Sequence, residues 1–169
     1  MRPSRLHFAA ALLIVTLLPG CSRSPSQGSS KETTDNRPSR HAGARNLAAD
    51  EEEGGHTLKK HVGRSDGDLR ERIRMEPEIS AASTYTDRRT AEDFVGDCLA
   101  ENEARIGQWM DRDRHPNLVL DCVGDPAWPL GRSLRRGQSE TEPCSQGTVV
   151  LKWKPSHDYY VLTSYPDCR

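Results

Sequence analysis

The spacing of the apolar residues changes partway along the chain, and this change is the strongest constraint on the fold. Between Asp87 and Met110, apolar side chains recur at intervals of three and four, which is typical of a helix with one buried face. After His115-Pro116 the interval becomes two, which predicts strands over residues 118–123, 131–136, 147–153 and 159–165. Helices followed by an antiparallel sheet indicate an α+β fold.

Two N-terminal helices have recognisable caps. Ser65 can cap a short helix that reaches Met75, and Asp87 can cap the longer one. Cys98 falls on the apolar face of the longer helix, so we expect its disulfide partner on the sheet that packs against this face.

The last two predicted strands form an antiparallel hairpin. In the final strand, Tyr159, Val161, Thr163 and Tyr165 alternate and are expected to share one face. The hydroxyls of Thr163 and Tyr165 would then emerge side by side at the strand end. The alternative for Thr163 is that it is simply a good strand former.

Residues 1–20 have the character of an export signal. Arg2 and Arg5 precede the apolar stretch from Phe8 to Leu18, which is too short to span a bilayer. The following Leu-Pro-Gly-Cys resembles a lipobox, in which Cys21 is acylated and becomes the mature N-terminus. We expect a lipoprotein exported to the outer membrane or cell surface, and the alternative is a secretory signal with an incidental cysteine.

Beyond Cys21 the composition divides the mature chain in two. Residues 21–46 are rich in Ser, Gly, Arg and Pro and have no apolar periodicity, so we expect a disordered tether. Residues 47–169 are expected to form one domain. The chain has only two Phe, three Trp and four Tyr, which is a thin supply for its core.

Four cysteines remain once Cys21 is assigned to lipid. An even number in an exported domain with a sparse core predicts two disulfides, for which three connectivities are open. The alternative is four free thiols. The cysteines concerned are Cys98, Cys122, Cys144 and Cys168.

The charge balance excludes one common form of nucleic-acid recognition. Without Arg2 and Arg5 of the leader, 22 basic residues face 25 acidic ones. The domain therefore lacks the general positive field of a typical nucleic-acid binder, and RNA contacts have to come from local positive clusters.

Two histidines are candidates for proton transfer. His56 and His61 lie five residues apart with Lys59 and Lys60 between them, a combination that suits a reaction needing a base, an acid and an anion stabiliser. No Glu follows His56, so this is not the zinc-protease spacing, and we expect neither a metal nor a cofactor. The alternative is two surface histidines in a polar segment.

A run of arginines follows the histidines. A guanidinium matches the geometry of phosphate, so one of these residues can be a phosphate ligand. The alternative is a solvated helix with Arg–Glu pairs. The run contains Arg64, Arg70, Arg72 and Arg74.

Several of these segments, in this order, resemble one family. The run Gly54-Gly-His-Thr-Leu-Lys-Lys-His-Val-Gly63 resembles the opening motif of the bacterial ribonuclease A-like domains at the C-termini of contact-dependent inhibition toxins. The resemblance continues through residues 69–73 and 79–87. It closes with Tyr159-Tyr-Val-Leu-Thr-Ser-Tyr-Pro166, so it covers nearly all of residues 47–166.

This resemblance implies an active site. Its catalytic residues would be His61, Arg72, Thr163 and Tyr165, with His56 as a second candidate histidine. Lys60 and Arg64 are expected to bind substrate. The implied activity is that of a metal-independent endoribonuclease, in which the RNA 2′-hydroxyl attacks the adjacent phosphorus and leaves a 2′,3′-cyclic phosphate and a 5′-hydroxyl end.

Other functions stay open at this point. The net acidity fits a non-catalytic binding module of the cell envelope on the same fold, and a lipid-tethered structural protein is a third alternative. For the enzyme, the expected partners are RNA, an immunity protein and the membrane through Cys21, and the domain is expected to be a monomer. The toxin relatives usually end a very large protein and generally lack disulfides, whereas this sequence has a short leader and four further cysteines.

Overall fold

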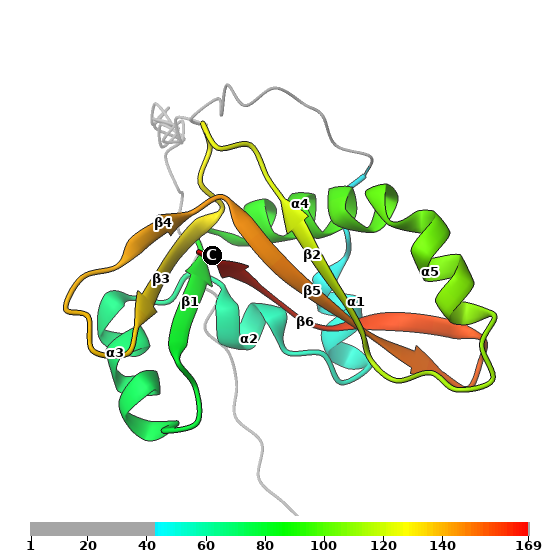
Figure 1. Cartoon of the computed structure of the whole chain (residues 1–169), viewed down its shortest axis with the longest axis horizontal. Helices are drawn as coiled ribbons and strands as arrows, with labels where there is room; N and C mark the ends of the chain where they lie inside the picture. The colour runs from blue at the N-terminus through cyan, green and yellow to red at the C-terminus, as the bar shows by residue number, and fades with distance from the viewer. Residues whose placement is uncertain (1–42, 169) are drawn as a thin grey trace, which may run out of the picture. The chain divides into compact units, whose positions relative to one another are not determined.

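The computed structural model describes residues 43–168, which contain helices and two antiparallel sheets. The expected signal peptide, the lipidation site at Cys21 and most of the expected tether lie outside the described residues. None of the described helices is long and apolar enough to cross a membrane. The predicted α+β fold is confirmed (Figure 1).

The N-terminal half of the domain holds the helices and one strand. They are α1 (Leu47–Glu52), α2 (Thr57–His61), α3 (Asp66–Met75), β1 (Ala81–Tyr85), α4 (Arg88–Glu101) and α5 (Glu103–Met110). The remaining strands follow: β2 (Leu118–Val123), β3 (Gly131–Arg135), β4 (Glu142–Cys144), β5 (Gln146–Lys154) and β6 (Asp158–Asp167).

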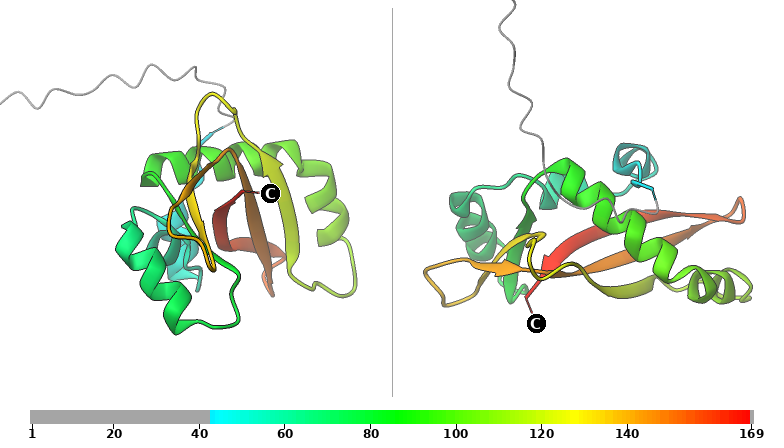
Figure 2. Two further views of the ribbon diagram at one scale, coloured as in Figure 1. Left: turned by 60° about the vertical axis from the view of Figure 1, so that its left-hand side comes forward. Right: turned by 90° about the horizontal axis from the view of Figure 1, so that it is seen from above.

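The strands form two three-stranded antiparallel sheets, in the orders β1-β3-β4 and β2-β5-β6. Helix α4 runs across one face of the β2-β5-β6 sheet, as the two viewpoints of Figures 1 and 2 show. The main core lies between them. It includes Phe94 and Val95 of α4 and, from the sheet, Leu120, Val149 and Val161.

A smaller core joins α3 to the other sheet. Leu69 and Ile73 lie one turn apart on α3 and pack with Ala82 of β1 and Leu134 of β3. Ser65 caps this helix, as predicted, because its side chain accepts a hydrogen bond from the backbone three residues later.

The single long helix predicted from Asp87 to Met110 is wrong, since two helices meet at Asn102. Asn102 leaves the helical conformation, with φ −109° and ψ 15°, and its side-chain amide donates to the Cys98 carbonyl at 2.9 Å. An asparagine side chain competes in this way with the helical backbone ladder. Asp87 does cap α4, accepting from the backbone N–H of Thr90 at 2.7 Å.

Strand β1 is absent from the sequence prediction, as are the short elements α1, α2 and β4. Four of the five residues of β1 are buried, including the polar Ser83 and Thr84, so it shows no alternation of apolar and polar residues. The succession of helices and then strands therefore holds only in outline.

The face predicted for the last strand is wrong in one respect, because β6 contains a bulge. Val150 pairs with Thr163 whereas Leu151 pairs with Val161, so Leu162 is an extra residue. One extra residue reverses the alternation of side chains. Val161 is fully buried in the core, and Thr163 and Tyr165 lie on the opposite face of the strand.

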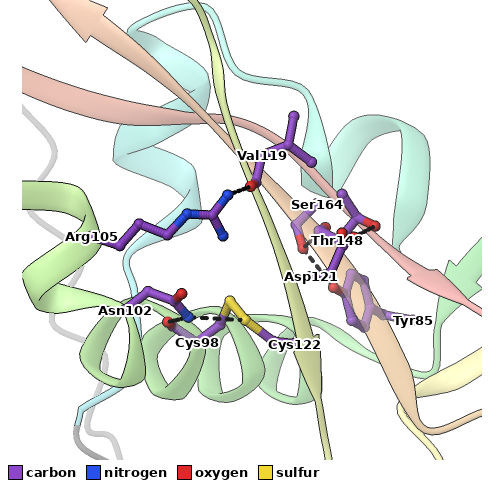
Figure 3. Close-up of a disulfide and its surroundings, with 9 residues drawn as sticks. All are labelled: Tyr85, Cys98, Asn102, Arg105, Val119, Asp121, Cys122, Thr148 and Ser164. Atoms are coloured by element: carbon purple, nitrogen blue, oxygen red, sulfur yellow. Dashed lines mark hydrogen bonds between the residues drawn. A yellow bond between two sulfur atoms is a disulfide. The ribbon is translucent and has the colours of Figure 1, made fainter. Parts of the chain in front are cut away.

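The prediction of two disulfides is confirmed, and the structure gives their connectivity. Cys98 of α4 joins Cys122 of β2, so the partner of Cys98 does lie on the sheet packed against the helix (Figure 3). Cys144 of β4 joins Cys168, just beyond β6. Each bridge closes a loop with a sequence separation of 24 and contributes about 3 kcal/mol by the chain-entropy argument.

Candidate active site

The two motif histidines lie at opposite ends of one short helix. His56 is the N-cap of α2 and His61 its last residue, and their ring centroids are 6.4 Å apart. Strand β6 passes beside the start of this helix, because the His56 N–H donates to the Leu162 carbonyl at 3.0 Å. Gly55 fits only because it has no side chain, since a Cβ there would lie 2.5 Å from the Val161 carbonyl oxygen.

A pocket of about 460 Å³ opens beside this helix and collects the predicted catalytic residues. His56, His61, Arg72, Thr163 and Tyr165 all line it. They come from α2, α3 and β6, segments separated by up to 109 positions in the sequence. The remaining lining residues are Glu78, Ile79, Ser80, Ala81, Ser83, Ser133, Pro166 and Asp167.

His61 is the most buried group of the pocket that can transfer a proton, with 6% of its surface exposed. Burial lowers its pKa from 6.5 to about 3; the Arg72 guanidinium is the next cause, and a hydrogen bond with the Ser83 carbonyl acts in the opposite direction. The imidazole is therefore neutral at pH 7 and has a lone pair with which to accept a proton.

The Nδ1 atom of His61 has two neighbours of opposite character. It lies 3.3 Å from the Ser83 carbonyl oxygen and 3.4 Å from Nη1 of Arg72. In the neutral ring, Nδ1 donates to the carbonyl only when it carries the proton and accepts from the guanidinium only when it does not. The two contacts favour opposite tautomers, so the position of Arg72 bears on which nitrogen of His61 is basic.

Arg72 is half-buried and held on α3 by a carboxylate. Its Nε donates to the Glu76 side chain at 3.3 Å, one helical turn further along. This pairing leaves Nη1 directed towards His61. A permanently charged, planar donor thus lies at the wall of the pocket, as recognition of a phosphate requires.

The last strand contributes two hydroxyl groups. The Tyr165 ring lies 5.3 Å from the His61 ring, measured between centroids. The Thr163 Oγ1 is buried and has no hydrogen-bond partner within the described protein. A buried polar atom of this kind is expected to have a partner, so Thr163 is available to a molecule that enters the pocket.

His56 is half-buried, and its pKa is lowered, chiefly by desolvation and then by the positive charges of Lys60 and Arg72. Glu51 acts in the opposite direction. His56 is thus a second imidazole at the pocket wall, in a more open position than His61.

The two expected substrate-binding residues do not line the pocket. Lys60 is exposed, and its positive charge lowers the pKa of both histidines. The Arg64 side chain folds back to the Lys59 carbonyl, and its backbone N–H donates to the Thr84 hydroxyl at 2.9 Å. The structure therefore separates Lys60 and Arg64 from the group formed by the five catalytic candidates.

Sequence reasoning missed the residues that complete the wall. Ser83 acts through its main-chain carbonyl, for which no side-chain pattern exists, and Ser133 reaches the pocket because β3 pairs with β1 at that residue. The nearest signal was that Ser83 falls within residues 79–87, one of the segments that carry the family resemblance. Among the described residues, no group of three or more His, Cys, Asp or Glu side chains is placed to hold a metal ion.

Comparison with known proteins finds one matching family and a similar solved structure. The family model of the "Bacterial CdiA-CT RNAse A domain" matches residues 55–166, which include all five catalytic candidates. A solved structure titled "Crystal structure of CdiA-CT/CdiI complex from Y. kristensenii 33638" is 27% identical, covers 68% of this chain and 100% of that chain, and has a TM-score of 0.61. No curated protein sequence matches the chain.

Proposed function

The chain belongs to the family of bacterial CdiA-CT RNase A domains, and from this membership we propose that it is an endoribonuclease that cleaves RNA by transphosphorylation. The observation that carries the proposal is the single pocket formed by His56, His61, Arg72, Thr163 and Tyr165. These side chains supply a neutral base, a fixed cation and hydroxyl donors around one space large enough for a nucleotide.

In this proposal His61 is the general base. With Nδ1 turned towards Ser83 and Arg72, Nε2 is the nitrogen that takes the proton from the RNA 2′-hydroxyl. When Arg72 contacts the phosphate instead of His61, Nδ1 carries the proton of the neutral ring and donates it in the hydrogen bond to the Ser83 carbonyl. Nε2 then has the free lone pair. Substrate binding would thus favour the tautomer in which Nε2 is basic. The negative phosphate would also offset the Arg72 charge, which is the second cause of the lowered pKa of His61, and so would raise this pKa towards the range in which a general base is effective.

The other roles follow from position. Arg72 stabilises the negative charge on the pentacoordinate phosphorus, because it lines the pocket and Lys60 does not. Tyr165 gives its hydroxyl proton to the leaving 5′-oxygen, with His56 as the alternative acid. Thr163 binds a phosphate oxygen or a base edge through its unpaired hydroxyl.

Each step uses only groups of the chain and the substrate. The 2′-oxygen forms a bond to phosphorus while the bond to the 5′-oxygen breaks, which leaves a 2′,3′-cyclic phosphate and a 5′-hydroxyl. The nucleophile belongs to the RNA and the proton acceptor is an imidazole, so the proposed reaction does not require a metal ion.

The site of action and the partner are also proposals. We propose an exported protein anchored through lipid on Cys21, and the two disulfides support export because such bonds persist in oxidising compartments. The related solved structure is a complex with CdiI, and this likeness supports a partner protein that protects the producing cell from the nuclease.

Cleavage of a short labelled RNA by the oxidised protein in EDTA tests the proposed function. The wild type is expected to cut, and His61→Ala to lose at least about 100-fold in rate while remaining folded, because general base catalysis contributes about 10²–10⁴-fold. Lys60→Ala is the matched control and should retain most activity. No cleavage by a folded wild type, or full activity in His61→Ala, would contradict the proposal.

A further inference from the structure

One serine of β6 lies between two catalytic candidates but faces away from them. Ser164 separates Thr163 from Tyr165, and it is fully buried on the core side of the strand. Alternation along the strand means that a serine held in the core turns both neighbours to the opposite face, where the pocket is. The contacts that hold the Ser164 side chain in the core therefore also direct the side chains of Thr163 and Tyr165 towards the pocket.

The Ser164 side chain is held by a buried chain of hydroxyl groups, drawn in Figure 3. Its Oγ donates to the Thr148 carbonyl at 2.9 Å and lies 2.6 Å from the Tyr85 hydroxyl. A serine hydroxyl has a single proton, and Thr148 receives it, so Tyr85 has to donate to Ser164. Tyr85 is fully buried, and burial raises the pKa of its phenol, which keeps this donor protonated.

Tyr85 also holds the chain that follows the catalytic histidine. Its carbonyl accepts from the Gly63 N–H at 3.1 Å, and it forms a parallel bridge with Val62, the residue directly after His61. Two positions earlier in the same strand, the Ser83 carbonyl contacts Nδ1 of His61. Strand β1 therefore fixes the end of α2 that presents His61.

The same serine reaches the other half of the site through its backbone. The Ser164 N–H donates to Oγ1 of Thr57 at 2.8 Å, and Thr57 is the first residue of α2. The bonds form a closed circuit that runs from α2 to β1, across the Tyr85–Ser164 hydroxyl pair to β6, and back to α2. Neither Tyr85 nor Ser164 lines the pocket.

We infer that Tyr85 and Ser164 are positioning residues, whose buried hydroxyl bond sets the distance between His61 on one side of the site and Thr163 with Tyr165 on the other. The inference rests on the proposed ribonuclease function. In that reaction the base and the acid act on opposite sides of one phosphorus, and misplacement of a reacting group by about 1 Å can cost about 100-fold in rate.

The direct test is Tyr85→Phe, which keeps the ring that packs on Phe94 and removes only the hydroxyl. We expect kcat to fall by about 10- to 100-fold with KM changed by less than about threefold, because Arg72, the proposed phosphate ligand, is held on α3 outside this circuit while His61 and Tyr165 shift relative to each other. Tyr160→Phe is the matched control, since Tyr160 is also a buried tyrosine, lies on β6 with Ser164 and does not line the pocket. It should keep full kcat.

A second variant separates positioning from general weakening of the fold. The double variant Tyr85→Phe with Ser164→Ala should lose no more kcat than the larger single loss, because both changes break the same bond. Losses that multiply would mean that the hydroxyls act independently, and an unchanged kcat in folded Tyr85→Phe would also overturn the inference.

A measurement that does not depend on catalysis distinguishes this inference from the proposed function. The rings of His61 and Tyr165 are close enough in the wild type for a proton–proton nuclear Overhauser effect, with centroids 5.3 Å apart. This signal should weaken in Tyr85→Phe and persist in Tyr160→Phe. If it is unchanged in Tyr85→Phe, the positioning role fails whether or not the protein cuts RNA; if it weakens in an inactive protein, only the proposed function fails.

Discussion

Acid should destabilise this domain through His61 by a predictable amount. Burial, followed by the Arg72 charge, lowers the pKa of His61 from 6.5 to about 3 in the folded state. In the unfolded chain the imidazole returns to its ordinary pKa. As the pH falls below 6.5, the unfolded state binds a proton that the folded state does not, so the free energy of unfolding decreases.

The size of this decrease follows from the width of the pH interval. Each pH unit below 6.5 costs about 1.4 kcal/mol until the folded-state pKa is approached. By pH 4 the cost is about 3 kcal/mol, a large part of the ~5–15 kcal/mol that stabilises a typical domain. Because His61 is only 6% exposed, solvent screening reduces this figure little.

Guanidinium denaturation at pH 7 and pH 4, compared between wild type and His61→Gln, measures the effect. Carboxylates titrate in both proteins and cancel in the comparison, so the wild type should lose about 3 kcal/mol more than the variant. His157→Asn, at an exposed histidine outside the pocket, controls for the removal of a histidine. Parallel losses in wild type and His61→Gln would show that His61 is not held neutral by burial.

Three further outcomes are expected. Arg72→Met should raise the pKa of His61, because the guanidinium is the second cause of its lowering, and an NMR titration that finds the pKa unchanged would contradict this. Thr163→Val should reduce cleavage by about tenfold without lowering the free energy of unfolding, because its buried hydroxyl has no hydrogen-bond partner to lose. A free energy of unfolding lowered by more than about 1 kcal/mol would count against this account of Thr163. Replacing Cys144 and Cys168 by serine should lower both kcat and stability, because this bridge anchors the pocket-lining end of β6. Replacing Cys98 and Cys122 by serine should lower stability alone. Equal losses of kcat in the two variants would contradict this distinction.

The fold was predictable where periodicity and packing agree. Strand β2 has the predicted bounds of residues 118–123, and the cap of α3 at Ser65 is the predicted one. Strand β1 was not predictable, because its buried residues include the polar Ser83 and Thr84, and the partner of the Thr84 hydroxyl, the Arg64 N–H, is supplied only by the tertiary structure. The break at Asn102 follows from a side-chain bond to the Cys98 carbonyl, which a count of apolar spacings does not register.

The residues that gather in the pocket were predicted as a set only from the family resemblance, because spacing alone left His56 and His61 open between a catalytic pair and two surface histidines. Alternation alone would place Thr163 on the face of Val161, in the core, and it is the bulge at Leu162 that brings Thr163 to the pocket. The Ser83 carbonyl was missed because a main-chain atom leaves no signature in the sequence. Lys60 and Arg64 were expected to bind substrate because they are basic and lie within or next to the motif, but Lys60 is exposed, the Arg64 side chain donates to the Lys59 carbonyl, and neither lines the pocket.

The central claim is that the substrate's own 2′-hydroxyl is the nucleophile, and one substitution in the RNA tests it most directly. An oligonucleotide with a single preferred cleavage position is compared with the same molecule carrying 2′-deoxyribose at that position, both with the oxidised protein in EDTA. The account predicts that the all-ribose RNA is cut to a 2′,3′-cyclic phosphate and a 5′-hydroxyl end, and that the deoxy-substituted RNA is bound but not cut there. Cleavage at the deoxy position, or a product without the cyclic phosphate, would contradict transphosphorylation and with it the role assigned to His61.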